Sequence, residues 1–99
     1  MSYVSELAAA IRAELPVDLV PNEDAESLFV LYALLALVKG IAVTSEDVHD
    51  AWAAWMTLRG EAHESLVPFR RLSAATRAED DPFVTAIRRV AAHQKDASS

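Results

Sequence analysis

Eleven consecutive apolar residues, from Leu28 to Val38, constrain this chain more than any other feature of its sequence. A helix on a protein surface has an apolar stripe and a polar face, whereas a helix that is apolar all round must be covered on every side. The run therefore predicts a central buried helix over about residues 23–39. A membrane-spanning helix needs about 20 apolar residues. Because Lys39 interrupts the run well short of that length, we expect a core helix and no membrane contact.

The composition indicates one small all-α domain. Of the 99 residues, 53% are apolar and 24% charged, which is typical of a single globular domain. Two glycines and four prolines leave little turn chemistry for a sheet, so we expect four to five helices over residues 1–99. The chain has no cysteine, which excludes disulfides and thiolate metal sites. Its first residues lack the basic and apolar regions of a secretory signal, which predicts a cytoplasmic protein.

Apolar spacing and end signals place the other helices. Apolar residues recur at helical spacing over about residues 2–15 and 45–59, and Gly60 suits the left-handed position that ends a helix. The pair Asp81-Pro82 is a typical helix start, with the aspartate as N-cap and the proline as first helical residue. Between these helices, residues 62–72 contain a proline that disfavours helix before it. We expect this segment to be extended and to precede the last helix.

The charge is unevenly distributed along the chain. The net charge of −6 argues against general nucleic-acid binding, which depends on lysine and arginine contacts to phosphates. Residues 1–58 carry nine acids and two basic residues, whereas residues 59–99 carry six acids and seven basic residues. Any surface that binds an anion is therefore expected in the C-terminal part, where Arg70 and Arg71 are adjacent. Guanidinium groups pair well with phosphate and carboxylate. The alternative is a solvated face whose arginines pair with nearby acids.

His49 and Trp52 lie one turn apart in the predicted helix over residues 45–59. A histidine next to a tryptophan suits a pocket that stacks a flat ligand. The alternative is that Trp52 and Trp55 are core or dimer contacts, because aromatic residues supply much of the packing energy of a small domain.

The sequence gives no sign of a metal site, a cofactor or catalysis. The histidines at positions 49, 63 and 93 lack the spacing of a zinc protease or a zinc finger. No nucleophile elbow is present, and the serines at chain ends and helix starts have simpler explanations. We therefore expect a protein that is not an enzyme and that needs no cofactor.

Three stretches, VHDAW (48–52), HESLVPFRRL (63–72) and EDDPFVTAIRRV (79–90), resemble the ryanodine-receptor-type repeat domain. That family has a His-x-x-Trp helix, then a His-Pro-x-Leu-Val-Pro-Tyr/Phe-x-x-Leu segment and a closing helix. His49, Trp52 and His63 match this pattern, but Glu64 replaces the proline, and the family's glycine-tryptophan and tyrosine-glycine loop is absent.

The resemblance covers residues 48–90 and implies a two-part chain. Residues 44–95 would form the part that is similar to the repeat domain, and residues 1–43 a helical N-terminal part. Small bacterial and phage members of the family are suspected of sensing nucleotide-type ligands in phage–host conflict. The abundance of alanine and arginine, with few lysines, is likewise typical of actinobacterial or phage genes.

These observations support two hypotheses about function. In the first, the chain is a non-enzymatic binding domain for an anionic, nucleotide-like ligand beside five residues: His49, Trp52, His63, Arg70 and Arg71. In the second, it is a helical interaction module that forms a homodimer or binds a host protein. Three short helices with this many large apolar residues can leave an uncovered patch, which marks an interface.

Overall fold

The computed structural model describes residues 2–21 and 24–98, with side chains up to Gln94. Within these residues it contains helices and turns and no β-strand, so the predicted all-α fold is confirmed. In chain order the elements are α1 (Tyr3–Ala13), η1 (Val17–Leu19), α2 (Ala25–Lys39), η2 (Gly40–Ala42), α3 (Ser45–Leu58), η3 (Phe69–Arg71), α4 (Ala74–Ala78) and α5 (Asp81–Ser98), where η marks a short 3₁₀ turn. The predicted extended segment is irregular and includes η3.

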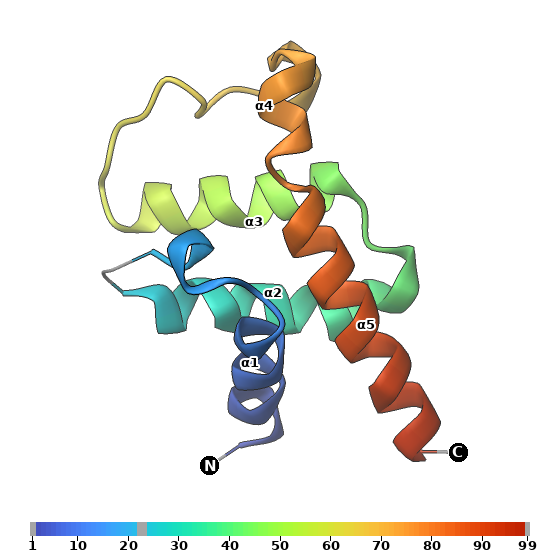
Figure 1. Cartoon of the computed structure of the whole chain (residues 1–99). Coiled ribbons are helices and arrows are strands. Elements are labelled where there is room, and N and C mark those ends of the chain that lie inside the picture. Colours follow the sequence, from blue (N-terminus) through green and yellow to red (C-terminus); the bar gives the residue numbers. More distant parts are fainter. Residues whose placement is uncertain (1, 22–23, 99) are drawn as a thin grey trace.

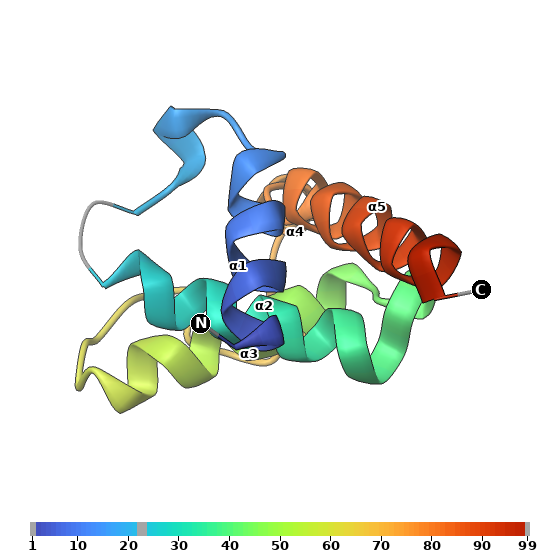
Figure 2. The ribbon, with the colours of Figure 1, turned by 90° about the horizontal axis from the view of Figure 1, so that it is seen from below.

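α2 is the central helix of the fold. It lies between α1 and α3 and also contacts α5 (Figure 1). Seen from below, α1 crosses α2, and α3 lies on the other side of α2 (Figure 2). The inner face of α2, which these three helices bury, consists of Ala25, Leu28, Phe29, Tyr32, Ala33 and Ala36.

The opposite, outer face of α2 is exposed, although it is equally apolar. Leu34 is 52% exposed and Val38 is 69% exposed. The prediction that this helix is covered on every side is therefore wrong. The reason is geometric: α1, α3 and α5 pack on three sides, and within the described residues no element packs on the fourth.

By length and composition alone, α2 together with η2 is apolar enough to cross a membrane. The window Ala25–Ala42 has 18 residues and a mean hydropathy of 1.8, and 33% of it is buried inside the fold. Core helices of proteins that never enter a membrane meet the same criterion. The buried part consists of the inner face, which is packed against other helices.

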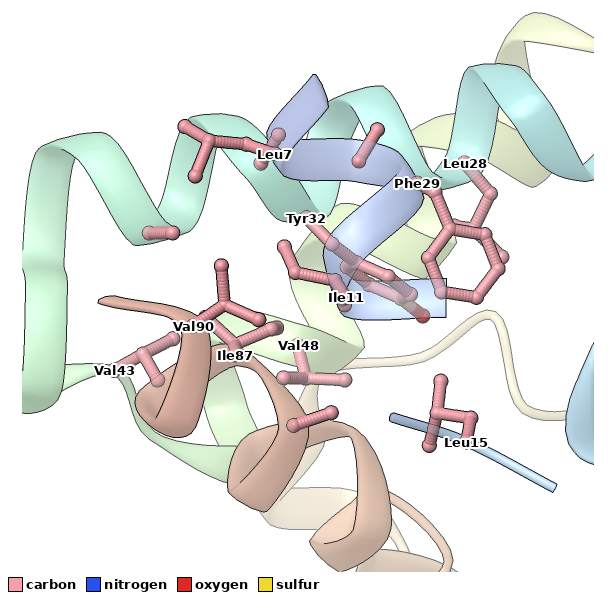
Figure 3. Close-up of a cluster of buried hydrophobic side chains, with 14 of the residues drawn as sticks. Leu7, Ile11, Leu15, Leu28, Phe29, Tyr32, Val43, Val48, Ile87 and Val90 are labelled. Atoms are coloured by element: carbon pink, nitrogen blue, oxygen red, sulfur yellow. The ribbon is translucent and has the colours of Figure 1, made fainter. Parts of the chain in front are cut away.

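The main core lies where α1, α2, α3 and α5 meet (Figure 3). Ile11 of α1, Phe29 of α2 and Ile87 of α5 are fully or almost fully buried there. The Phe29 and Tyr32 rings meet edge to face with 5.4 Å between their centroids, a favoured geometry for an aromatic pair. The N-terminal helix is therefore part of the same core as α3 and α5.

Local signals fix both ends of α3. At its start, the Thr44 side chain accepts a hydrogen bond from the Asp47 N–H (3.2 Å), and the Asp47 carboxylate accepts one from the Thr44 N–H (2.9 Å). This reciprocal pair satisfies two amides that have no partner inside the helix. Gly40 and Gly60, which follow α2 and α3, have φ angles of +59° and +72°. Gly60 ends α3 with the positive φ angle that the sequence predicts, whereas Gly40 ends α2 in a different conformation, with a ψ angle of −134°.

α5 begins one residue earlier than predicted. The Val84 N–H donates to the Asp80 carbonyl oxygen (3.0 Å), so Asp80 rather than Asp81 occupies the N-cap position. Further along, Arg88 donates from Nε (2.9 Å) and from one terminal nitrogen (2.7 Å) to the Val43 carbonyl oxygen. This contact attaches α5 to the turn before α3 and so holds the N-terminus of α3 in position against α5.

Candidate functional site

One cavity brings together three of the five predicted site residues. It has a volume of about 240 Å³ and opens between α2, α3, the segment after α3 and the start of α5. Figure 1 shows that segment running from the end of α3 back to α4. We call it the ring-lined cavity, because its walls include the rings of Tyr32, His49, Trp52, His63 and Phe83.

α3 supplies one wall of the ring-lined cavity. His49 is only 4% exposed, and its Nε2 lies 2.7 Å from the Val67 carbonyl oxygen. Because a carbonyl oxygen only accepts, this nitrogen carries the proton. The His49 ring also contacts Trp52 and Phe69, with 5.8 and 6.0 Å between centroids. His49 thus attaches the segment after α3 to the helix that precedes it.

His63 reaches the cavity from that segment. Its ring meets the Trp52 indole edge to face, with 5.2 Å between centroids. Its Nδ1 accepts a hydrogen bond from the Ser65 backbone N–H (3.0 Å). Nδ1 therefore has no proton to donate, and Nε2 is the nitrogen available to a ligand. His49, Trp52 and His63 form a continuous row of rings.

The other wall contains residues that the sequence analysis did not include in the site. Tyr32 from the inner face of α2 packs against Phe83 of α5, with 5.7 Å between ring centroids. Glu79 and Asp80 add two carboxyl groups at the junction of α4 and α5. From their positions in the chain, these acids can be interpreted only as helix-start residues or partners of arginine, because their distance from Tyr32 and Trp52 depends on the fold.

The electrostatic character of the ring-lined cavity is acidic. Burial raises the pKa of Asp80 to about 6; the positive charge of His49 opposes this shift, and the negative charges of Glu79 and Asp81 add to it. Burial also raises the pKa of Tyr32, and the nearby Asp80 carboxylate adds to the shift. Among the described residues, no lysine or arginine lines the cavity. It therefore presents negative charge beside aromatic surfaces.

Arg70 and Arg71 are not in the ring-lined cavity. Both lie in η3 and are exposed. Nearby Arg77 donates to the carbonyl oxygens of Phe69 (3.2 Å) and Arg70, and its guanidinium lies over the Phe69 ring at 5.4 Å from the centroid. Arg77 therefore holds the turn in place. The structure does not gather the arginines of the C-terminal part around His49 and Trp52.

The two tryptophans of α3 have different surroundings. The Trp55 Nε1–H donates to the Ser27 hydroxyl (3.0 Å) and the Asp24 carbonyl oxygen (3.3 Å), and Arg59 stacks on its ring at 4.4 Å from the centroid. This buried indole is a core residue, in line with the alternative interpretation. Trp52 is half-buried and borders the cavity.

Among the described residues, no three His, Cys, Asp or Glu side chains lie close enough together to hold a metal ion. Although His49, His63, Glu79 and Asp80 line one cavity, they do not form such a group. What the cavity offers is flat apolar surface, imidazole N–H and carboxylate oxygen.

The chain matches the family model of the domain of unknown function DUF7701 over residues 2–92. The chain belongs to this family. The match runs from α1 into α5, so a DUF7701 domain includes both the N-terminal helices and the ring-lined cavity. No curated protein matches the chain, and no solved structure does.

Proposed function

We propose that this DUF7701 domain binds a small, flat, nitrogen-rich ligand in the ring-lined cavity. Such a ligand stacks against Trp52 and donates N–H groups to the Asp80 carboxylate. The observation that carries the proposal is the convergence of aromatic and imidazole rings with two acids around one opening. Aromatic faces and carboxylates both favour cationic or N–H-donating groups.

The size of the cavity limits the ligand. Pockets for drug-sized ligands have volumes of about 300–1,000 Å³, and this one has about 240 Å³. It has room for one ring system with its amino or amidine substituent, such as a nucleobase or an aromatic amidine. It does not enclose a whole nucleotide.

The acids favour a different ligand charge from the anionic one that we expected from the sequence. Glu79 and Asp80 would repel a phosphate inside the cavity, while Arg70 and Arg71 lie outside its lining. Burial and the negative charges of Glu79 and Asp81 disfavour the ionised form of Asp80 and raise its pKa. A bound cation would stabilise that ionised form. The proposed ligand is therefore cationic or neutral, and phosphates, if present, extend into solvent.

Contacts within the fold support a relationship to the ryanodine-receptor-type repeat domain as a further proposal. The two stretches with the strongest resemblance pack directly on each other, through His49 to Val67 and Phe69 and through Trp52 to His63. The resemblance would then reflect a shared way of shaping a pocket. A binding role without catalysis, in a phage or actinobacterial setting, remains part of the same proposal.

NMR titration tests the proposed function, because the two indole N–H signals report separately on Trp52 and Trp55. Benzamidine serves as a flat cation, adenosine as a neutral aminopurine and ATP as an anion. We expect benzamidine or adenosine to shift the Trp52 signal and leave the Trp55 signal nearly unchanged. Asp80→Asn should weaken binding about tenfold or more, since a charge-assisted hydrogen bond contributes roughly 1.5–3 kcal/mol.

Asp81→Asn is the matched control, because it removes the same charge from the neighbouring exposed position. It should change the affinity by no more than about twofold. Binding of ATP that depends on Arg70, and is unaffected by Asp80→Asn, would contradict the proposal and restore the anionic ligand. Failure of all three probes to move the Trp52 signal would also count against it.

A further inference from the structure

The outer face of α2 is a second candidate for function and is separate from the ring-lined cavity. Val30, Leu34, Leu37 and Val38 are exposed on it. Residues 27–38 include no charged side chain. The exposed apolar side chains of this face present on the order of 400 Å² of surface, which is within the range of patches that are often functional in monomers.

The sequence of this face is symmetric about Leu34. Residues 30–38 are VLYALLALV, so valines stand four positions before and after Leu34, and leucines stand three positions before and after it. On a helix, positions at ±3 and ±4 share the face of the central residue. In the structure Val30 and Val38 are both exposed, whereas Leu31 is half-buried against the core and Leu37 is exposed. The exposed symmetric pattern therefore consists of Leu34 and the two valines.

A surface that reads the same in both directions matches itself under two-fold rotation. In a two-fold dimer, the same patch on each copy meets its equivalent. With Leu34 at the axis and the helices antiparallel, Val30 of one copy lies on the side of Val38 of the other. Residues 30, 34 and 38 also form the i±4 ridge, and the packing of two such ridges gives the commonest helix crossing, about −50°.

The absence of charged residues on the outer face and the open side between α1 and α3 both favour a second copy of the chain as its partner. The net charge of −6 opposes self-association by general repulsion, and an interface formed by residues 27–38, which carry no charge, adds no further repulsion at close range. α1 flanks the face near Val30, where Ser5 and Ala9 share a groove with it. α3 flanks the other side, where Trp55 and Leu58 share a groove with Leu31. The side between these two helices is open to an incoming helix.

We propose that the chain forms an antiparallel, two-fold homodimer in which the outer faces of α2 pack on each other with Leu34 at the axis. A stable interface buries about 800 Å² per partner, of which roughly 55–65% is apolar. The outer face, with on the order of 400 Å², supplies less than this apolar share of roughly 440–520 Å², so the exposed side chains of Ile41 and Leu58 beside it would contribute the rest. Side chains of α1 and α3 beside it would supply the polar rim.

Analytical ultracentrifugation of the full chain tests the assembly. We expect the wild type to be dimeric at about 100 μM and the Leu34→Glu/Leu37→Glu variant to be monomeric with unchanged helical circular dichroism. Val17→Glu is the control, because Val17 is 89% exposed and lies in η1, outside the outer face. This variant should remain dimeric. A wild type that stays monomeric at that concentration would overturn the proposal, as would a double variant that remains dimeric.

Disulfide cross-linking tests the arrangement, because the chain has no cysteine of its own. Leu34→Cys should form a disulfide-linked dimer on mild oxidation, since the two copies of this residue meet at the axis. Val30→Cys should not, because its two copies lie on opposite sides of the axis, beyond the roughly 7 Å that a disulfide spans between Cα atoms. Equal cross-linking of both variants would overturn the antiparallel arrangement.

Flotation with vesicles of phosphatidylcholine and phosphatidylglycerol separates a protein interface from a lipid-binding surface. We expect the wild type to remain in the protein fraction. Co-flotation that Leu34→Glu/Leu37→Glu abolishes would overturn the homodimer in favour of a membrane surface. None of these results depends on the ring-lined cavity, so the homodimer can fail while the proposed ligand binding holds, and the reverse.

Discussion

The inner and outer faces of α2 are both apolar but have opposite surroundings. Leu28 and Phe29 on the inner face are almost fully buried, whereas Leu34 on the outer face is half exposed. Hydrophobicity alone therefore indicates that a helix needs neighbours, but not on which side they lie. Shape makes the distinction here: the inner face mixes two aromatic rings with three alanines, which allow α1, α3 and α5 to approach closely.

The comparison also separates two possible roles. The inner face contributes Leu28 and Tyr32 to the ring-lined cavity, so it connects the core to a ligand site. The exposed residues of the outer face do not line this cavity, and their side chains face solvent. If both proposals hold, one helix carries a pocket on one side and an interface on the other. The following predictions test how strongly the two faces differ.

The largest expected difference is between Phe29→Ala and Leu34→Ala. Phe29 is 1% exposed, and truncation of a buried phenylalanine typically costs about 3–5 kcal/mol through lost burial and the cavity that remains. Leu34→Ala should change the unfolding free energy of the monomer by no more than about 0.5 kcal/mol, as is usual for surface positions. Urea denaturation at low micromolar concentration measures both values.

Repeating the Leu34→Ala measurement at high protein concentration sharpens this comparison. A homodimer stabilises the native state by mass action, so the wild type should then gain stability that the variant lacks. Equal losses for Phe29→Ala and Leu34→Ala in the dilute monomer would show that the outer face is covered within the chain.

Trp52→Ala is expected to have an intermediate effect on the free energy of unfolding. Trp52 lies in the wall of the ring-lined cavity that faces the inner face of α2. Trp52 is half-buried, so its truncation should cost about 1–3 kcal/mol, less than that of a buried tryptophan. The protein should remain folded and lose binding of benzamidine. Trp55→Ala is the matched control, and it should destabilise the fold more because this indole is buried and hydrogen-bonded to Ser27. Complete unfolding by Trp52→Ala would instead make Trp52 a core residue.

A smaller change in stability than that of Trp52→Ala is expected for Asp80→Asn, and it depends on pH. The pKa of Asp80 is about 6 in the folded protein, above about 3.9 in the unfolded chain, so the native state binds more protons between these values. Asp80 therefore makes the protein less stable as the pH rises from about 4 to 6. Because this carboxyl is half exposed, the effect at pH 7.5 should be on the order of 1 kcal/mol after solvent screening.

Asp80→Asn should accordingly stabilise the ligand-free protein at pH 7.5 and flatten its stability between pH 4 and 6, as measured by urea denaturation. Binding of benzamidine to the wild type should weaken as the pH falls below about 6, because the carboxylate becomes protonated. His49, Glu79 and Asp81 interact with Asp80, so the Asn variant is needed to isolate its contribution. An Asn variant with the wild-type pH profile would assign the titration to another group.

The candidate site was predictable in part. His49, Trp52 and His63 stand out because imidazole and indole rings recur in recognisable stretches, and the structure places all three on one cavity. Asp80 does not stand out, because its position before Asp81-Pro82 is explained equally well by a helix start. Arg70 and Arg71 stand out as adjacent cations. The position of their side chains depends on the conformation of η3, and neither residue lines the cavity.

The sequence by itself determined the helical class of this protein and several helix ends. The capping pair of Thr44 and Asp47 and the glycines at positions 40 and 60 act through neighbours only a few residues away, so their effects are readable in the chain. Only the tertiary structure decided which face of α2 is covered and that Tyr32, Trp52 and Asp80 line one cavity. Those outcomes depend on contacts between residues that are distant in sequence, and local propensity carries no information about them.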